Sequence, residues 1–359
     1  MKESLVLAIN PGSTSTKIAV FNCDYEKLFQ ENIKYTAEEL APFASITDQY
    51  EFREDGILTK LKEAGIDKNK IKIVVGRGGL VKPIESGMYE VNEAMIKDLK
   101  VGILGQHASN LGGLIADDIA KNIPGAKAFI ADPVVVDELQ DVARITGHPA
   151  CEKVSIFHAL NQKAIARAHA KSQNKDYNKM NLIVAHLGGG ISVGAHYQGR
   201  VIDVNQALDG DGPFTPERSG GLPTGALIKL CFSGKYSYND VKKMLTGQGG
   251  LVAYLGTNDA QKVENMVKDG DEKATLIYKA MAYQIAREIG SAAAVLKGKV
   301  EAILFTGGIA YDKTFIEWIK EYVEFIAPIF VYPGEDEMKA LAFNGINFLK
   351  GESQIKEYK

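Results

Sequence analysis

The chain has 359 residues, of which 45% are hydrophobic and 24% are charged, and its formal net charge is -3. This composition is typical of a globular protein long enough for about two domains. The weak negative charge and the lack of a basic run argue against nucleic acid and anionic membranes as partners. Three widely spaced cysteines, Cys23, Cys151 and Cys231, indicate neither a disulfide framework nor a thiolate metal site.

Targeting and membrane segments are not predicted from the residue pattern. Only six strand-like residues follow Lys2 and Glu3, which is too short for the core of a signal peptide. No apolar run approaches the roughly 20 residues that a membrane helix needs. We therefore expect a protein of the cytoplasm that has no membrane partner.

The first predicted elements form a β-hairpin around "NPGSTSTKIAVF", residues 10–21. Apolar runs at residues 4–9 and 18–21 predict two short strands. The turn between them offers backbone N–H groups, several hydroxyls and Lys17, which together can hold phosphate. A solvated turn rich in serine and threonine explains the same residues.

Strands and helices alternate along the rest of the chain, which indicates a layered α/β architecture. Strands are predicted near residues 28–34, 71–75, 126–130, 181–185, 301–305 and 329–332. Helices are predicted near residues 48–64, 92–99, 107–122, 154–171, 224–232, 238–246, 258–268, 272–297 and 336–350, with one more between the last two strands.

The pattern restarts at residue 186, where "HLGGGISVGAHYQGRVIDV" again gives a glycine-rich turn between strands. We therefore predict two halves of one design. The first is a domain of residues 1–150, completed by a C-terminal helix at about 340–359, and the second spans residues 151–339. Two such turns facing each other could hold a polyphosphate from both sides.

Two common nucleotide-binding signatures, the P-loop and the dinucleotide fingerprint, do not occur in the sequence. A third glycine-containing segment, "FTGGIA" at residues 305–310, lies between a predicted strand and a predicted helix. Such glycines let the backbone approach a ligand closely, although a tight strand-to-helix turn explains them as well.

Eight segments in order resemble the acetokinase family of acetate and butyrate kinases, within the sugar kinase, Hsp70 and actin superfamily. The resemblance runs nearly end to end. It implies an α/β fold of two duplicated RNase H-like domains with a nucleotide-binding cleft between them. The segments are "INPGSTSTKIAVF", "VVGRGGLVKPI", "AFIADPVVVDE", "VAHLGGGISV", "DGDGPFTPERSGGLP", "YLGTNDA", "LFTGGIAYD" and "VYPGEDEMKALA".

The resemblance also implies a reversible, direct in-line transfer of the γ-phosphoryl group of ATP to a short-chain carboxylic acid. Run backwards, the reaction makes ATP from ADP and an acyl phosphate. Its transition state spreads negative charge over the phosphoryl oxygens, so catalysis consists mostly of alignment and charge neutralisation. A carboxylate nucleophile is already ionised at neutral pH, so cations are needed rather than a strong base. We expect Mg²⁺ or Mn²⁺ to take part.

Two charged residues match the family positions closest to the chemistry. Arg77, inside "GRGG", matches the family's carboxylate-binding arginine, and a guanidinium can bind a carboxylate or phosphate with two hydrogen bonds. Asp132, at the end of a predicted strand, matches the catalytic aspartate, and a carboxylate there can hold Mg²⁺. The alternatives are a solvated arginine and an aspartate that caps a helix before Pro133.

Asn10 and Glu337 match family positions that orient the metal and its waters, with Glu335 and Asp336 close enough to leave the second assignment open. His158 matches the histidine that steadies the transferring phosphoryl group. His107 and His186 match other site histidines. None of the six histidines has the spacing of zinc ligands.

The glycine-rich turns receive their roles from the same resemblance. The first hairpin is expected to line the γ-phosphate end of the site, and the second hairpin is expected to line the β-phosphate side. The glycines of "FTGGIA" are expected to border the adenosine. In the same order, the residues concerned are Gly12, Ser13, Ser15 and Lys17; Gly188, Gly189 and Gly190; and Gly307 and Gly308.

The chain departs from acetate kinases at several positions, which favours the butyrate branch. Gln162 stands where a second histidine is expected, Gly189 replaces an asparagine, and Arg218 is the only nearby candidate for a second substrate arginine. We expect Gly78 and Gly79 to leave a slot for three or four carbons beside Arg77.

Several alternatives stay open at this stage. They are a propionate or branched-chain acid kinase, a sugar kinase, and an ATPase of the actin or Hsp70 kind. The family also leads us to expect a homodimer or a higher homo-oligomer that forms through the C-terminal half.

Overall fold

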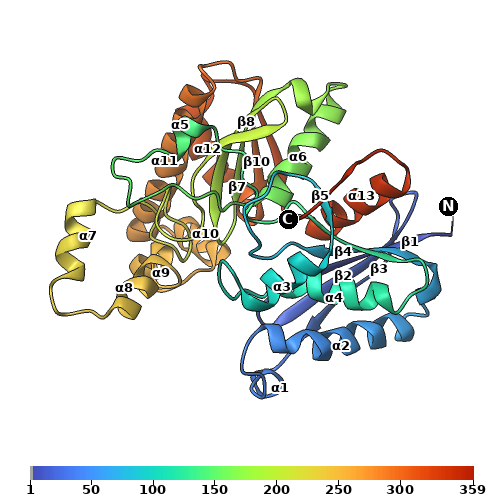
Figure 1. The fold of residues 1–359 in the computed structure, drawn as a ribbon. Helices are drawn as coiled ribbons and strands as arrows, with labels where there is room; N and C mark the ends of the chain where they lie inside the picture. Colours follow the sequence, from blue (N-terminus) through green and yellow to red (C-terminus); the bar gives the residue numbers. More distant parts are fainter. Residues whose placement is uncertain (1–2) are drawn as a thin grey trace. The chain divides into compact units, whose positions relative to one another are not determined.

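A computed structural model describes residues 3–359, which divide into two compact units (Figure 1). Unit 1 combines the N-terminal part of the chain up to Val136 with Asp336–Lys359, and unit 2 is Asp137–Glu335. Residues 137–150, which we predicted in the first domain, therefore belong to unit 2, and residues 336–339 belong to unit 1. No helix within residues 3–359 is both long and apolar enough to span a membrane.

Contacts of the residues after Val136 explain why unit 2 begins there. Glu138 forms a buried ion pair with Lys163 of unit 2 at 2.6 Å, and the main-chain N–H of Gln140 donates to the carbonyl of Ile202. A buried ion pair ties its segment firmly, because breaking it would leave a charge unpaired away from water. The chain therefore joins unit 2 directly after Val136.

Unit 1 is built on a seven-stranded sheet of order β12-β5-β6-β4-β1-β2-β3. β1, β2 and β3 form an antiparallel meander, and β4 and β6 follow parallel to β1. The strands are β1 (Leu5–Pro11), β2 (Ser15–Asn22), β3 (Lys27–Lys34), β4 (Ile71–Arg77), β5 (Met88–Glu90), β6 (Lys127–Ala131) and β12 (Ile355–Lys356).

Helices cover both faces of this sheet, which is why its central strands are almost wholly apolar. α13 lies on one face, where Gly345 packs against Val6 and Ile73, and α2 and α4 lie on the other (Figure 1). The helices are α1 (Ala37–Leu40), α2 (Tyr50–Glu63), α3 (Glu93–Val101), α4 (Asn110–Lys121) and α13 (Glu337–Leu349). A β-carbon on Gly112 of α4 would lie 2.2 Å from the carbonyl oxygen of Arg77, so this glycine permits the close crossing of α4 and β4.

Unit 2 repeats the same core topology. Its sheet has the order β11-β10-β7-β8-β9, with an antiparallel meander β7-β8-β9 and with β10 and β11 parallel to β7. Strand for strand, this order and these directions match β6-β4-β1-β2-β3 of unit 1. The predicted α/β fold with two duplicated domains is therefore confirmed. The strands are β7 (Asn181–Leu187), β8 (Ile191–Tyr197), β9 (Arg200–Val204), β10 (Ala302–Gly307) and β11 (Ile329–Pro333).

Helices again cover both faces of the sheet of unit 2 (Figure 1). Ala166 and Ala170 of α6 pack on one face, and Ile285 and Ile289 of α11 pack on the other. The helices are α5 (Asp141–Arg144), α6 (Ala159–Ser172), α7 (Thr224–Cys231), α8 (Tyr238–Leu245), α9 (Gly250–Leu255), α10 (Ala260–Lys268), α11 (Glu272–Val295) and α12 (Lys313–Val323).

Five short strands and α-helices were not predicted from the sequence, namely β5, β12, α1, α5 and α9. β12 has only two residues, yet it extends the sheet of unit 1 by pairing with β5. Tyr358 secures it, because its buried hydroxyl accepts from the N–H of Lys82 and donates to Asp98. Such a strand depends on contacts with distant residues, so no local sequence pattern predicts it.

Candidate active site

Three of the predicted site residues of unit 1 lie at one edge of its sheet. Asn10 lies near the end of β1, Arg77 ends β4, and Asp132 follows β6. β1, β4 and β6 are parallel neighbours, so their carboxyl ends meet at the same edge, about 5 Å apart from strand to strand. This is the edge at which α/β sheets usually bind ligands.

Asn10, Arg77 and Glu337 are in direct contact. Nη1 of Arg77 lies 3.2 Å from Oε1 of Glu337 and 3.3 Å from the amide oxygen of Asn10, and the amide nitrogen of Asn10 donates to Glu337. The three side chains are largely shielded from solvent. One cation and three oxygen acceptors therefore meet at the edge of the sheet.

The structure shows which of the three consecutive acidic residues 335–337 contacts Asn10. Asp336 caps α13 and accepts from the main-chain N–H of Lys339 at 3.0 Å. Glu335 lies in unit 2, 3.5 Å from Nε2 of His186. Only Glu337 has its carboxylate at Asn10.

Asp132 adopts a conformation that is uncommon for a residue with a side chain. Its φ is +38°, and the residue is 2% exposed. Its Oδ1 accepts from the hydroxyl of Ser86 at 2.6 Å and from the N–H of Gly87 at 2.8 Å. The chain after Asp132 forms turns before α5 begins, so the helix-capping alternative is wrong. Left-handed backbone of this kind costs about 1–3 kcal/mol and is concentrated at functional sites.

The first glycine-rich turn joins β1 to β2 as predicted. The N–H of Gly12 donates to the carbonyl of Ser15 at 2.7 Å, which closes the turn. The N–H groups of Ser13 and Thr14 lie at its exposed tip and donate no hydrogen bond to another residue within 3–359. Lys17 stands opposite Asn10 in the register of the two strands, with its side chain exposed. The turn thus presents N–H donors and a cation to an anion.

Arg53 of α2 is a residue that sequence reasoning missed. Its guanidinium is wholly buried beneath the first turn and donates to the main-chain carbonyls of Gly12 (2.7 Å), Ser13 (2.8 Å) and Ser15 (3.1 Å). Gln49 accepts from two further N–H groups. The carbonyls of Gly12 and Ser13 point to Arg53. The N–H groups of Ser13 and Thr14 belong to the same two peptide planes, so they point the opposite way.

Replacing Arg53 with methionine should destabilise the protein by about 3 kcal/mol, because three carbonyls of the turn lose charged donors. Urea unfolding of the Arg53→Met variant measures this loss. The matched control is Arg144→Met, which removes a partly exposed guanidinium bound to Asp137 and should cost less than about 1 kcal/mol. Equal losses in the two variants would show that the buried guanidinium does not hold the turn.

His107 lies before α4 rather than inside the helix predicted at 107–122. Its side chain is exposed, and Nδ1 lies 2.7 Å from the hydroxyl of Ser109. The N–H of Ser109 also reaches Nδ1, at 3.2 Å. These contacts hold the imidazole at the beginning of α4.

The predicted site residues of unit 2 also follow the carboxyl ends of parallel strands. His186 lies near the end of β7, and Gly188, Gly189 and Gly190 form the turn to β8. Gly307 ends β10, and Gly308 opens the short 3-10 helix η4 (Gly308–Tyr311). Since β10 and β7 are parallel neighbours, both glycine-rich segments lie at the same edge of the sheet.

His158 and His186 are stacked face to face. Their ring centroids lie 3.8 Å apart with an interplanar angle of 11°. His158 immediately precedes α6, and Nδ1 of His186 donates to the amide oxygen of Asn161 at 2.8 Å. Asn161 belongs to the first turn of α6, so the beginning of this helix positions both imidazoles.

Arg218, left open by the sequence, lies against the second glycine-rich turn. A β-carbon on Gly190 would lie 2.3 Å from Nη1 of Arg218 and 3.1 Å from Cε1 of His158. Burial lowers the pKa of the Arg218 guanidinium. Thr215 supports the turn from the same segment, since its hydroxyl donates to the carbonyl of Gly189 at 2.8 Å. Arg218, His158 and Gly190 are therefore neighbours.

The glycines of unit 2 differ in what they permit. Gly307 has φ +92°, and a β-carbon there would lie 2.3 Å from the carbonyl oxygen of Leu187, so the fold itself requires it. β-carbons on Gly189 and Gly308 would meet no atom within 4 Å. Of these three, Gly189 and Gly308 are the positions where a ligand can approach the backbone closely.

The expected acyl slot at Gly78 and Gly79 is wrong. A β-carbon on Gly78 would lie 2.5 Å from Cβ of Pro133, and one on Gly79 would lie 2.6 Å from Cα of Asn110. Protein atoms already fill this space. These glycines bring the chain after β4 close to α4 and to the segment after Asp132, and they leave no room for carbons of a substrate.

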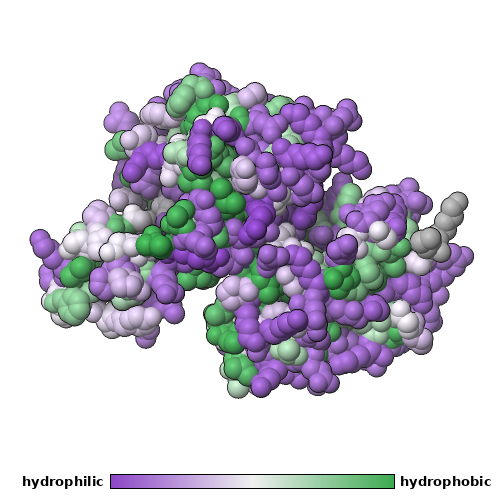
Figure 2. Space-filling view, turned by 45° about the horizontal axis from the view of Figure 1, so that its top comes forward, coloured by the Kyte–Doolittle hydropathy of each residue, from purple (hydrophilic) through white to green (hydrophobic). Residues whose placement is uncertain are grey.

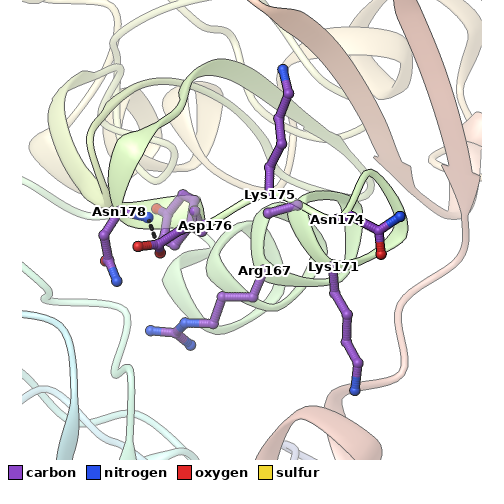
Figure 3. Close-up of a pocket in the computed structure, with 8 residues that line it drawn as sticks. Arg167, Lys171, Asn174, Lys175, Asp176 and Asn178 are labelled. Carbon is purple, nitrogen blue, oxygen red and sulfur yellow. Dashed lines mark hydrogen bonds between the residues drawn. The ribbon is translucent and has the colours of Figure 1, made fainter.

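A groove at the end of α6 is lined by basic residues, but it is not built to hold one anion. Figure 3 shows the side chains of Arg167, Lys171 and Lys175 pointing away from one another. Lys175 forms an ion pair with Glu301 at 2.7 Å. Lysines and arginines near the end of a helix also complement its dipole, which explains this cluster without a ligand.

The comparisons with known proteins agree with the resemblance drawn from the sequence. A model of the acetokinase family matches residues 154–324. The chain is 55% identical to butyrate kinase 2 and 54% identical to butyrate kinase 1 of Clostridium acetobutylicum, each over 99% of both chains.

Solved structures share the fold at low sequence identity. The acetate kinase of Porphyromonas gingivalis has a TM-score of 0.80 at 21% identity, over 96% of this chain and 100% of that one. A propionate kinase of Francisella tularensis has a TM-score of 0.76 at 20% identity, over 95% and 98% of the two chains.

Proposed function

The chain belongs to the acetokinase family, and on that premise we propose that it transfers the γ-phosphoryl group of ATP to butyrate and forms butyryl phosphate and ADP. The observation that carries the proposal is the 55% identity to a butyrate kinase over 99% of both chains. The transfer is direct, in line and reversible, with ATP and ADP as the nucleotides.

In unit 1, Arg77 binds the carboxylate of the acid. The carboxylate attacks a phosphoryl group that is itself negative, so the approach of the two anions must be compensated. Support comes from the position of Arg77 at the carboxyl end of β4 and from its contacts with Asn10 and Glu337. The planar guanidinium can hold the acid with two hydrogen bonds and align one oxygen for attack.

Asn10, Asp132 and Glu337 orient Mg²⁺ or Mn²⁺ and its waters. No cluster of three or more histidine, cysteine, aspartate or glutamate residues able to hold a metal occurs in the described part of the chain. An amide and two carboxylates nevertheless suit Mg²⁺, which usually takes one or two carboxylates together with phosphates and water. When bound, the cation neutralises charge that develops on the phosphoryl oxygens.

Each unit, taken by itself, has further donors suited to phosphate. The N–H groups of Ser13 and Thr14 and the ammonium of Lys17 donate to the γ-phosphate. In unit 2 the β-phosphate lies at the second glycine-rich turn, His158 and Arg218 donate to the transferring group, and Gly308 borders the adenosine. The N–H donors at the tip of the first turn and the proximity of Arg218 to His158 support these assignments.

We also propose that the chain forms a homodimer or a higher homo-oligomer through unit 2. α7 and α8 bury none of their residues, and large apolar side chains are exposed on and around them, namely Leu222, Ile228, Phe232, Tyr236, Tyr238 and Tyr254. Figure 2 shows green and pale residues on the left-hand part of the molecule, where α7 and α8 lie in Figure 1. Exposed apolar surface of this kind marks protein interfaces.

A panel of acids tests the proposed substrate. Butyrate has two more methylenes than acetate, and each buried methylene is worth about 0.8 kcal/mol, so kcat/KM should favour butyrate by about tenfold or more. Propionate should fall between them. ADP formation with ATP and Mg²⁺ is measured for each acid, for isobutyrate and for a polyol. Faster turnover with acetate would contradict a butyrate preference, and stimulation by the polyol alone would indicate a sugar kinase.

A further inference from the structure

A run of buried polar side chains in unit 2 leads from Tyr177 to His158. The hydroxyl of Tyr177 lies 2.8 Å from Nδ1 of His196, and Nε2 of His196 lies 2.9 Å from the amide oxygen of Gln162. The amide nitrogen of Gln162 donates to the carbonyl (3.0 Å) and to the hydroxyl (2.8 Å) of Ser192. That hydroxyl lies 2.9 Å from Nδ1 of His158.

The main-chain carbonyl of Ser192 fixes the direction of the outer hydrogen bonds. A carbonyl only accepts, so the amide of Gln162 must turn its NH₂ group to Ser192 and its oxygen to His196. That oxygen requires a proton on Nε2 of His196, which leaves Nδ1 of His196 to accept from Tyr177. Burial lowers the pKa of His196 well below its ordinary value, which agrees with a neutral ring that carries one proton.

The same reasoning fixes the proton of Ser192. Its hydroxyl oxygen accepts from Gln162 and, more weakly, from the main-chain N–H of His158 at 3.4 Å. The single hydroxyl proton is then donated to Nδ1 of His158. A neutral imidazole that accepts at Nδ1 carries its own proton on Nε2.

We propose that Gln162 is a positioning residue that holds His158 in the Nε2-protonated tautomer by way of Ser192. This inference rests on the proposed function for the role of His158, whose Nε2–H donates to the transferring phosphoryl group. Negative charge grows on those oxygens in the transition state, so a ring that presents an N–H stabilises it. The other tautomer would present a lone pair and repel the same oxygens.

Gln162 has this role at a position where the resemblance leads us to expect a histidine in acetate kinases. Gln162 is wholly buried in α6, one turn after His158, and its amide has both a donor group and an acceptor group. It therefore accepts a hydrogen bond from His196 and donates one to Ser192. An apolar residue of similar size satisfies neither of them.

The tautomer can be read directly from ¹⁵N NMR spectra of histidine-labelled protein. The signals of His158 are assigned by their loss in His158→Asn, and wild-type protein should show a protonated Nε2. In Gln162→Leu the Ser192 hydroxyl is no longer held as an acceptor, so both tautomers of His158 should appear. We expect kcat with butyrate to fall about tenfold, with KM for ATP and for butyrate within about twofold of wild type.

Two further variants separate this role from a loss of stability. Ser192→Ala removes the donor to His158 and keeps the carbonyl that holds Gln162, so the spectra and kcat should change in the same way. It also provides the test if Gln162→Leu does not fold. Tyr177→Phe removes a buried hydroxyl at the far end, where the proton on His196 is already fixed by Gln162, and should leave the His158 tautomer and kcat unchanged.

A protonated Nδ1 of His158 in wild-type protein would overturn the inference. So would an unchanged His158 spectrum and an unchanged kcat in folded Gln162→Leu or Ser192→Ala protein. The proposed function fails separately, if wild-type protein forms no ADP in response to butyrate. In that case the wild-type spectrum still decides whether the tautomer is held.

Discussion

Asp132→Asn should retain less than about one thousandth of the wild-type kcat, because it removes one charge from the residues assigned to the metal. Asparagine keeps the size of the side chain, and its amide oxygen can still accept from Ser86 and Gly87. The fold and the left-handed backbone at residue 132 should therefore persist. Turnover with ATP and butyrate over a series of MgCl₂ concentrations measures the effect, and the metal requirement should shift to higher concentration.

Asp137→Asn is the matched control for this variant. Asp137 also carries a carboxylate in the segment after β6, but it binds Arg144 at 2.5 and 2.7 Å. Its loss should leave kcat close to wild type. If Asp132→Asn kept most of its activity, the strained aspartate would serve the fold alone.

Arg77→Ala should lower kcat/KM for butyrate by about 100-fold or more, the usual cost of a lost charged contact in a transition state. Binding of ATP, measured by equilibrium dialysis without the acid, should stay nearly intact, because Arg77 is assigned to the carboxylate. Arg77→Lys keeps the charge but loses the planar fork, so its activity should lie between those of wild type and Arg77→Ala. Turnover of Arg77→Ala near the wild-type rate would remove the arginine from the reaction.

Part of the Arg77→Ala effect could arise from Glu337, whose partner is lost. Arg77→Lys keeps a cation beside Glu337 and leaves the carboxylate assigned to the metal unchanged, so it separates the two causes. If the planar guanidinium acts on the acid, Arg77→Lys should stay well below wild-type activity. Wild-type activity of Arg77→Lys would show that a cation beside Glu337 is enough and that the guanidinium has no special role.

Local patterns made much of the fold predictable. The two hairpins, at residues 10–21 and from residue 186, have apolar strands on either side of glycine-rich turns. Within each hairpin the strands and the turn lie within a few residues of each other. Asp132 could be placed where α/β sheets usually bind ligands because it ends a predicted strand. Periodicity of this kind needs no knowledge of distant neighbours.

Features that depend on tertiary neighbours could not be predicted in this way. An arginine in the first turns of a helix is usually solvated, yet Arg53 is buried because the carbonyls of a distant turn need its donors. Gly78 and Gly79 suggested open space, but Pro133 and Asn110 occupy it. Arg218 has no local signal that would place it beside Gly190. These three cases required the packing of segments far apart in the chain.

Trapping the product shows directly whether this chain joins phosphate to the carboxylate of butyrate. Wild-type protein is incubated with ATP, MgCl₂, butyrate and hydroxylamine, and butyryl hydroxamate and ADP are both quantified. We expect equal amounts of the two products, with neither formed when butyrate is left out. ADP that accumulates at the same rate with or without butyrate, and without hydroxamate, would overturn the proposed function and indicate an ATPase.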